Sequence, residues 1–474
     1  MDNFKKIATL EELEALKDLI HYENSGEHKP QDKREKVLVD FTKPVGKIKP
    51  VNGVGGGPLT GNFLWDSTEY FKEARIPYCR LHDIEHPFGC GEFVDINCIF
   101  KNFNADENDA DNYNFTATDK YIKAIIDCGA KVIFRLGTSI EHGLRIHTLP
   151  PKDFAKWARI CEHIIRHYNE GWANGFTFGI EYWEIWNEPD LGNLCWGGTF
   201  EQFIELYKTA AMHLKACFGD TIKVGGAAFT AGANDKTHLF LNALALDKRV
   251  PLDFYSFHRY AFKVEQILNE VHAARILLNK YGFAETETVF DEWNYVKSWK
   301  DGYTVMKKNI TSMMAAAFIG GTLLSLQKSP VNVATYYDAQ VGTTMREHWN
   351  GLFTAPEIWD EGNAIKSEPL KGYYAFKAFA ALTELGIEVT SDTAADHVYV
   401  VGAKDDDKGA FMMANFNPYE KLEHELVFDL KGVFGKKCEI YLLDEEHDLE
   451  LVYEGEIPES YKMMPETVVL VKLV

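Results

Sequence analysis

Short apolar segments alternate with longer helical patterns from about residue 48 to about residue 385, and no other feature limits the possible folds as strongly. Strand-like segments are expected at 48–54, 78–82, 131–137, 181–186, 222–227, 252–257, 288–290 and 333–337. Helices are expected at 121–128, 150–168, 199–214, 264–280, 309–326 and 370–385. Strands that alternate with helices form a parallel sheet, and eight of them favour a closed barrel over a doubly wound open sheet. The predicted fold class is therefore α/β, with a (β/α)8 TIM barrel over residues 46–385.

The two ends of the chain do not follow this alternation. Residues 1–35 are expected to form an amphipathic helix and a linker, because Thr9 and Glu12 have the spacing of a capping box. After Gly386 strand-like segments follow one another without a helix, at 397–402, 409–416, 424–430, 438–443, 449–453 and 467–473. They predict an accessory antiparallel β-sandwich over residues 386–474, which a strand at 36–41 completes.

The charge and the cysteine pattern limit the partners and the location. The 71 acidic residues outnumber the 50 Lys and Arg residues, which gives a net charge of −21 over 474 residues. Nucleic acids and anionic membrane surfaces need clustered positive charge, so neither is expected as a partner. The first residues lack the apolar run of a signal peptide, and the eight cysteines show no CxxC spacing. We therefore expect a cytoplasmic protein with free thiols, either as a monomer or as a homo-oligomer.

Two of the expected barrel strands end in a glutamate. The fourth strand runs into WNEP, in which Pro189 ends the strand directly after Glu188, and the seventh runs into DEWN, which contains Glu292. In such barrels the catalytic groups lie at the carboxyl ends of the strands. A single glutamate at a strand end is commonly a plain surface residue. Two of them, on strands that face each other across the barrel mouth, predict a carboxyl pair.

A carboxyl pair is what the cleavage of a glycosidic bond requires. One carboxylic acid protonates the leaving oxygen, while the other carboxylate attacks the anomeric carbon or activates a water molecule. Attack on the carbon retains the sugar configuration and needs a separation of about 5–5.5 Å, whereas inversion needs roughly 6.5–9.5 Å. The sequence therefore predicts a glycosidase, and the separation of the two carboxyl groups decides between the two reactions.

These motifs resemble those of a known group of enzymes. WNEP after the fourth strand and EWN after the seventh are similar to the clan of retaining glycosidases, and within it to glycoside hydrolase family 39, the family of β-xylosidases and α-L-iduronidases. Supporting segments are RLHD (80–83), PPKDFAKW (150–157), EIWNEPDLGNLCW (184–196), KVGG (223–226) and DFYSFHRY (253–260). The resemblance implies a retaining reaction in a barrel that carries a β-sandwich, with no cofactor and no metal ion.

The resemblance also implies roles for residues of this chain. Glu188 matches the acid/base, and Glu292 matches the nucleophile. Asn187 matches the residue that hydrogen-bonds the sugar 2-hydroxyl, a contact that strengthens in the transition state. His82 and His258 match histidines that lie at the sugar site.

Other candidates for the site each have a plain structural alternative. Arg80 matches a basic position near the nucleophile, or it neutralises carboxylates inside the barrel. Tyr260 is a candidate to orient the nucleophile. Trp196 either forms a sugar platform or packs a loop. Tyr337 stands where xylosidases of the family tend to carry a tryptophan. Glu184 should point into the barrel, where an ion pair is expected.

Two further interpretations concern metal binding and the substrate. His82 and His86 lie four residues apart near Asp83 and Glu85, but no third ligand is evident, so no metal site is predicted. The predicted function is a retaining, exo-acting glycosidase of the β-xylosidase type. The alternatives are a glycosidase of the same clan that acts on a galactoside, arabinoside or uronide, and a non-catalytic carbohydrate-binding protein.

Overall fold

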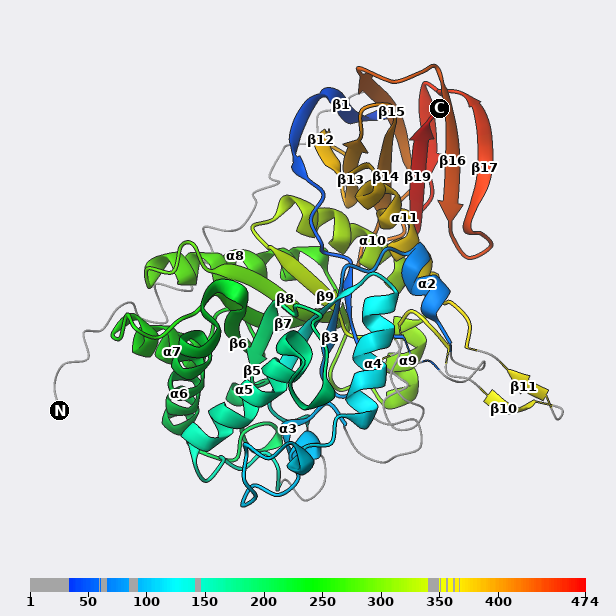
Figure 1. The fold of residues 1–474 in the computed structure, drawn as a ribbon. Coiled ribbons are helices and arrows are strands. Elements are labelled where there is room, and N and C mark those ends of the chain that lie inside the picture. The colour runs from blue at the N-terminus through cyan, green and yellow to red at the C-terminus, as the bar shows by residue number, and fades with distance from the viewer. Residues whose placement is uncertain are drawn as a thin grey trace.

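The computed structural model describes residues 34–58, 60, 66–84, 93–140, 146–339, 349, 351–354, 357–360, 363–365 and 367–474. Figure 1 shows the two parts of the fold, a barrel surrounded by helices and a strongly bent sheet at one side of it. The helix expected around Thr9 and Glu12 lies outside the described residues.

The eight parallel strands close into a barrel, which confirms the predicted fold class. Each strand is hydrogen-bonded to the next along the chain, and the last pairs with the first. The strands are β2 (Gly53–Gly55), β3 (Tyr78–Leu81), β4 (Lys131–Leu136), β5 (Tyr182–Ile185), β6 (Lys223–Phe229), β7 (Phe254–Ala261), β8 (Glu287–Tyr295) and β9 (Val333–Tyr336). Strands β6, β7 and β8 run further than the apolar segments at 222–227, 252–257 and 288–290 suggest.

Helices surround the barrel (Figure 1). Those that the sequence predicts are α4 (Thr116–Asp127), α5 (Phe154–Glu170), α6 (Phe200–Phe218), α8 (Val264–Lys280), α10 (Met313–Lys328) and α11 (Lys371–Leu385). Four more were not expected: α2 (Thr68–Glu73), α3 (Ile96–Ile99), α7 (Asp235–Ala245) and α9 (Tyr303–Ile310). Helices α2 and α3 have only 6 and 4 residues, too few to show a helical period, whereas the buried residues of α7 do have helical spacing.

The interior of the barrel changes from apolar to polar along the strands. A compact cluster fills its floor, made of Tyr78, Ile133, Tyr182, Phe254, Val289 and Val333. Because side chains alternate along a strand, the residues two positions further on point into the barrel as well. They are Arg80, Arg135, Glu184, Ser256, Asp291 and Thr335, all buried. The floor closes the barrel below, and this polar layer lies between it and the carboxyl ends of the strands.

The remaining strands form one sheet of nine, in the order β17-β16-β19-β14-β13-β12-β1-β15-β18. Their bounds are β1 (Arg34–Lys47), β12 (Ile387–Thr393), β13 (Val398–Lys404), β14 (Gly409–Asn415), β15 (His424–Lys431), β16 (Lys437–Leu443), β17 (Asp448–Glu456), β18 (Ser460–Met463) and β19 (Thr467–Leu473). Strand β1, which contains the segment expected at 36–41, pairs antiparallel with β12 and parallel with β15. Strands β12 and β18 were not anticipated.

This sheet bends around an apolar core of its own, to which side chains of β1 and of most other strands contribute. The accessory antiparallel β structure that the sequence predicts is therefore present, as a single curled sheet. Helices α10 and α11 lie between the barrel and the sheet and contact strands β13, β14 and β19 (Figure 1). A short hairpin of β10 (Glu357–Asp360) and β11 (Asn363–Ile365) projects from the barrel side.

Two smaller findings complete the description. The cysteines in the described part of the chain are all free thiols. No single described helix has both the length and the apolar composition to cross a membrane; α9 and α10 would reach that length only together, and they meet at an angle of 60°.

Candidate active site

The turn after β5 places Glu188 at the barrel mouth in an unusual backbone conformation. Trp186 and Glu188 have φ angles of 75° and 46°, in the left-handed region that side chains disfavour. Neighbouring elements hold this turn in place. The Glu188 N–H donates to the carbonyl of Ala228 over 3.0 Å. Asp190 accepts hydrogen bonds from Thr230 and Asn234 in the loop after β6.

On β8 a bulge brings two successive carboxyl groups into the barrel. Phe257 of β7 is paired with Phe290, but the next residue, His258, is paired with Glu292, so Asp291 is the extra residue. Strict alternation would send one of these two acidic side chains outward. Both are instead buried, Asp291 completely and Glu292 with 5% of its surface exposed.

His258 connects the two predicted catalytic glutamates. Its Nδ1 is 2.8 Å from Oε1 of Glu188 and 3.5 Å from Oε2 of Glu292. One donor atom from each of the three residues lies within 4.8 Å of the other two, so a carboxyl oxygen of Glu188 is within 4.8 Å of one of Glu292. These side chains are also of the types that bind metal ions. The tertiary structure thus brings the predicted pair together in one buried site.

Arg80 on β3 lies beneath this pair, with three carboxyl groups around its guanidinium. Its Nη1 donates to Oε1 of Glu292 over 2.7 Å, its Nε donates to Glu184 over 2.8 Å, and the same Nε is 2.9 Å from Asp291. Its Nη2 donates to Oδ1 of Asn187 over 2.7 Å. Arg80 therefore neutralises carboxylates in the barrel and fixes the predicted nucleophile, so the two interpretations of this residue coincide.

Burial governs the protonation of the site. It raises the pKa of Glu188 to about 8, and the nearby Asp190 adds to this. Burial also raises the pKa of Glu292, although the charges of His258 and Arg80 oppose the shift. For His258 burial disfavours the charged form and lowers the pKa to about 4. At neutral pH the imidazole is therefore neutral, and Glu188 holds its proton more firmly than an exposed glutamate.

The pKa values of two carboxyl groups in the polar layer are shifted in opposite directions. Burial and the negative charge of Glu184 raise the pKa of Asp291 well above its ordinary value, although Arg80 opposes this. Burial raises the pKa of Glu184 too, but Arg80 and hydrogen bonds from Asp291 and Ser256 outweigh it, and the pKa is lowered. Asp291 is therefore the member of the pair that holds a proton more readily, and Glu184 is the charged partner of Arg80.

Other predicted site residues also surround the glutamates. Tyr260 donates its hydroxyl to Oε2 of Glu292 over 2.7 Å, and Nε2 of His82 is 3.8 Å from Oε1 of the same glutamate. Oδ1 of Asn187 accepts from Arg80, whereas its Nδ2 is buried without a hydrogen-bond partner among the residues described. That amide is a free donor in the site.

Aromatic side chains from the end of β7 and from the segments after β8 and β9 lie together beside Glu292. The ring of Tyr260 is 5.2 Å from that of Trp299 and 5.2 Å from that of Trp349, and Trp349 is 5.9 Å from Tyr337. The hydroxyl of Tyr337 donates to Asp83 over 3.2 Å. Trp299 and Trp349 were not among the predicted residues. Their positions after the seventh and eighth strands are the only signal in the sequence that could have indicated them.

The sugar platform considered for Trp196 is wrong. Its ring is 1% exposed and packs edge-on against Trp186 at 5.0 Å, and its Nε1 donates to the carbonyl of Thr199. The buried indole therefore packs the loop after the WNEP turn, which is the alternative interpretation of this residue. His86, considered as a metal ligand together with His82, lies outside the described residues.

The sequence matches a known family over most of its length. Residues 35–413 match the family described as Glycosyl hydrolases family 39. The chain belongs to this family. The matched segment includes the barrel with both glutamates and extends into the curled sheet.

Two curated proteins are similar to this chain in sequence. A β-xylosidase from Caldicellulosiruptor saccharolyticus is 25% identical over 331 residues, which are 64% of this family 39 chain and 63% of that protein. A β-xylosidase from Geobacillus stearothermophilus is 28% identical over 165 residues, 32% of this chain and 31% of that protein. The chain thus matches less than two thirds of the length of either relative.

Solved structures show the same fold over nearly the whole chain. A glucosidase from Croceicoccus marinus superimposes with a TM-score of 0.72 at 21% identity, covering 94% of this chain and 99% of that one. A monomeric β-xylosidase from Caulobacter crescentus CB15 gives a TM-score of 0.65 at 17% identity, covering 92% and 99%. At these identities the likeness concerns the fold.

Proposed function

We propose that this family 39 chain is a retaining glycosidase of the β-xylosidase type, with Glu292 as nucleophile and Glu188 as acid/base. The observation that carries this proposal is the approach of the two carboxyl groups to within 4.8 Å, oxygen to oxygen, at Nδ1 of His258. Such closeness fits direct attack on the sugar, because inversion requires room for a water molecule between the carboxylate and the anomeric carbon.

The surroundings of the two glutamates support different roles. Glu292 receives hydrogen bonds from Arg80 and Tyr260, one on each oxygen, which hold a carboxylate in a fixed orientation for attack. Glu188 has no cationic partner among the described residues within ion-pair distance apart from His258, which is neutral at neutral pH. Its raised pKa suits a group that must deliver a proton.

The reaction follows in two steps. Glu292 attacks the anomeric carbon, the glycosidic bond breaks, and Glu188 gives its proton to the leaving oxygen. Glu188, now a carboxylate, takes a proton from water, which attacks the same carbon and releases Glu292. Nδ2 of Asn187 is available to donate to the 2-hydroxyl of the sugar throughout. No step needs a cofactor.

The xylosidase assignment comes from the two curated relatives and not from a pocket of the chain. The alternatives are a galactoside, an arabinoside or a uronide, and a panel of aryl glycosides of these sugars, with xylose and glucose, decides among them. Exo cleavage and a cytoplasmic location stay predictions from the sequence.

The mechanism is tested by replacing each glutamate. Glu292→Gln and Glu188→Gln should each lower kcat/KM by more than about 10³-fold on an unactivated glycoside. Azide added to Glu188→Ala should restore turnover of an activated substrate and yield a glycosyl azide of retained configuration. The matched controls are Glu287→Gln and Glu181→Gln, at the amino ends of the same two strands, where both side chains pair with Lys223.

The outcomes separate the alternatives. Activity within tenfold of the parent in both active-site variants would refute the assignment of the pair. An azide product of inverted configuration would mean that the reaction is a single displacement and not a double one. Tight oligosaccharide binding without turnover in the parent chain would mean that the fold serves as a carbohydrate-binding protein.

A further inference from the structure

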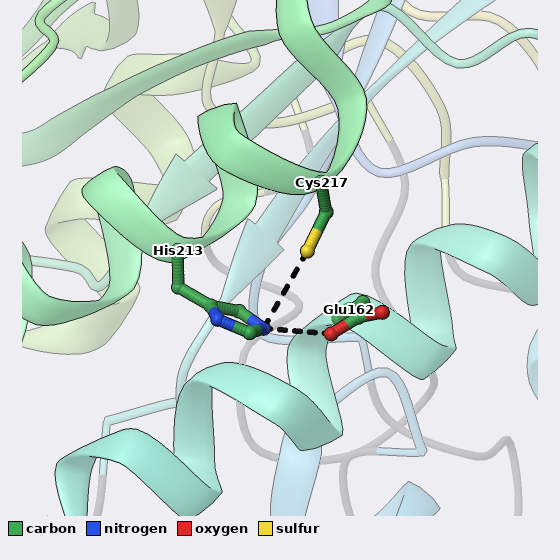
Figure 2. Close-up of side chains that lie close together, drawn as sticks. All are labelled: Glu162, His213 and Cys217. Atoms are coloured by element: carbon green, nitrogen blue, oxygen red, sulfur yellow. Dashed lines mark hydrogen bonds and ion pairs between the residues drawn. The ribbon is translucent and has the colours of Figure 1, made fainter.

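Three potential metal ligands converge between helices α5 and α6, outside the active site. Figure 2 shows them: His213 and Cys217 extend from α6, and Glu162 extends toward them from α5. His213 and Cys217 are four residues apart, so they lie on one face of the helix, one above the other. Each offers one donor atom, and the three atoms lie within 4.8 Å of one another.

The contacts within this group all meet at one atom. Nε2 of His213 is 2.6 Å from Oε2 of Glu162 and 3.8 Å from Sγ of Cys217 (Figure 2). A nucleophilic relay would need the thiol and the carboxylate on opposite ring nitrogens, since the base is held through one nitrogen and takes the proton through the other. Here the thiol and the carboxylate both lie at Nε2, so the three side chains are not arranged as a thiol nucleophile with its base.

The other oxygen of Glu162 is already occupied. Oε1 accepts from Nε of Arg166 over 2.8 Å, one turn further along α5. The carboxylate therefore has its charge compensated on one side and points its second oxygen toward the imidazole and the thiol. This arrangement leaves one donor each of oxygen, nitrogen and sulfur around a common point.

We propose that Glu162, His213 and Cys217 form a binding site for a borderline divalent transition-metal ion, of which Zn²⁺ is the prototype. Thiolate, imidazole and carboxylate together are the ligand set that zinc accepts in tetrahedral sites, with bonds of about 2.0–2.3 Å. Tetrahedral bonds of that length place the donor atoms roughly 3.3–3.6 Å apart. The imidazole and carboxylate must separate by less than 1 Å from their present 2.6 Å hydrogen bond.

Access and the fourth ligand follow from the partial exposure of the site. The side chain of His213 is 30% exposed and that of Glu162 is 14% exposed. An ion can therefore enter from solvent, and water supplies the fourth position of the tetrahedron. The ion binds the thiolate of Cys217 and the neutral imidazole of His213, whose own proton is then on Nδ1, so binding releases the thiol proton and weakens as the pH falls.

The site is remote from the proposed chemistry. Lys215, between the two α6 ligands in the sequence, pairs with Asp253 just before β7 begins. This part of α6 thus lies near the amino ends of the strands, whereas Glu188 and Glu292 lie at the carboxyl ends. An ion here joins α5 to α6 and stabilises the fold without touching the sugar.

The direct test uses Co²⁺ as a spectroscopic substitute for Zn²⁺ on tag-free protein freed of metal by a chelator. One equivalent should produce the visible d–d bands of tetrahedral cobalt and a near-ultraviolet thiolate-to-cobalt band. Zn²⁺ should then displace the cobalt. Cys217→Ser should abolish the thiolate band and weaken binding at least tenfold, and His213→Gln should weaken it similarly.

Cys195 provides the matched control, because its Sγ is 3.9 Å from Oε2 of Glu188, beside the other cluster of potential ligands. Cys195→Ser should leave the thiolate band unchanged. Loss of the band in Cys195→Ser but not in Cys217→Ser would locate the ion in the active site and overturn the proposal. Absence of any saturable one-to-one cobalt binding by the parent chain would overturn it as well.

Stability gives a second, independent measurement. An ion that binds only the folded chain at 100 times its Kd should raise the melting temperature by about 2–3 °C in the parent chain. The same concentration should raise it by no more than about half as much in Cys217→Ser, where binding is at least tenfold weaker. An equal rise in both would contradict a metal bridge between α5 and α6. None of these results depends on whether the chain cleaves glycosides.

Discussion

Nδ1 of His258 lies 2.8 Å from Oε1 of Glu188, in a part of the barrel from which water is almost excluded. The same nitrogen is 3.5 Å from Oε2 of Glu292. A charged imidazole at this position would draw both glutamates toward ionisation. Because burial lowers the pKa of His258 to about 4, the ring is neutral at neutral pH, and the two glutamates can keep different protonation states.

The pH dependence of the reaction should follow from this difference. Glu188 must be protonated in the first step and its pKa is raised to about 8, so kcat/KM should fall tenfold per unit above about pH 8. Glu292 must be ionised, so kcat/KM should also fall at acidic pH, where Glu292 takes up a proton. This fall is the acidic limb of the pH profile. Because the two groups interact, the limbs report apparent pKa values of the pair. The measurement is kcat/KM from pH 4 to 10.

A substrate that needs no acid provides the control. With a dinitrophenyl glycoside the leaving group departs without protonation, and the alkaline limb should flatten while the acidic limb remains. An alkaline limb that is equally steep for both substrates would mean that Glu188 does not act as the acid.

Replacement by a neutral side chain should affect stability little at Asp291 and strongly at Arg80. At pH 4, where Asp291 holds its proton, Asp291→Asn should change the free energy of unfolding by no more than about 1 kcal/mol. Arg80→Met leaves buried carboxylates without their cation, so it should cost about 3–5 kcal/mol. Urea unfolding of both variants measures the difference.

The pH dependence of stability distinguishes a protonated Asp291 from an ionised one. A carboxyl whose pKa is raised by folding binds more protons folded than unfolded, so its contribution to stability is lost as the pH rises above the unfolded pKa of about 3.9. Asp291→Asn lacks this loss and should gain stability relative to the parent between pH 4 and pH 7. A relative loss over that interval would show that Asp291 is ionised.

Tyr260→Phe should impair the nucleophile without disturbing the fold. It removes the hydroxyl that donates to Glu292 over 2.7 Å, so kcat should fall by about 10–100-fold with little change in KM. That hydrogen bond lowers the pKa of Glu292, so the acidic limb should also move to higher pH. Tyr255→Phe, on the same strand, removes a hydroxyl that donates to Gly232 instead, and it should leave the acidic limb in place.

Trp299 should contribute to binding and not to bond cleavage. Its ring is 64% exposed and 5.2 Å from that of Tyr260, so it can stack on the part of the substrate that leaves. Trp299→Ala should raise KM about 3–10-fold, and kcat should change by less than about twofold. Tyr419, similarly exposed but in the loop between β14 and β15, is the control, and Tyr419→Ala should alter neither constant. A drop in kcat alone for Trp299→Ala would exclude this role.

The order of the barrel strands and of most of the helices could be predicted from local pattern alone. An apolar segment followed by an amphipathic one indicates a strand and its helix whatever lies around them, and α8 begins and ends at the predicted residues, Val264–Lys280. Pro189 after Glu188 marks a strand end in the sequence itself. Since a barrel places all such ends on one rim, two glutamates at strand ends suffice to predict a carboxyl pair.

The sequence could not provide the features that depend on contacts between distant parts of the chain. The bulge at Asp291 arises from the pairing of β7 with β8, and the burial of Trp196 arises from the packing of its loop against Trp186. The raised pKa of Asp291, the neutral ring of His258 and the position of Trp349 likewise exist only in the folded molecule. Residue types and spacing determined which chemical groups are present. Only the tertiary structure decided their distances and their exclusion from water, and these set each charge, because electrostatic energy depends on separation and surroundings.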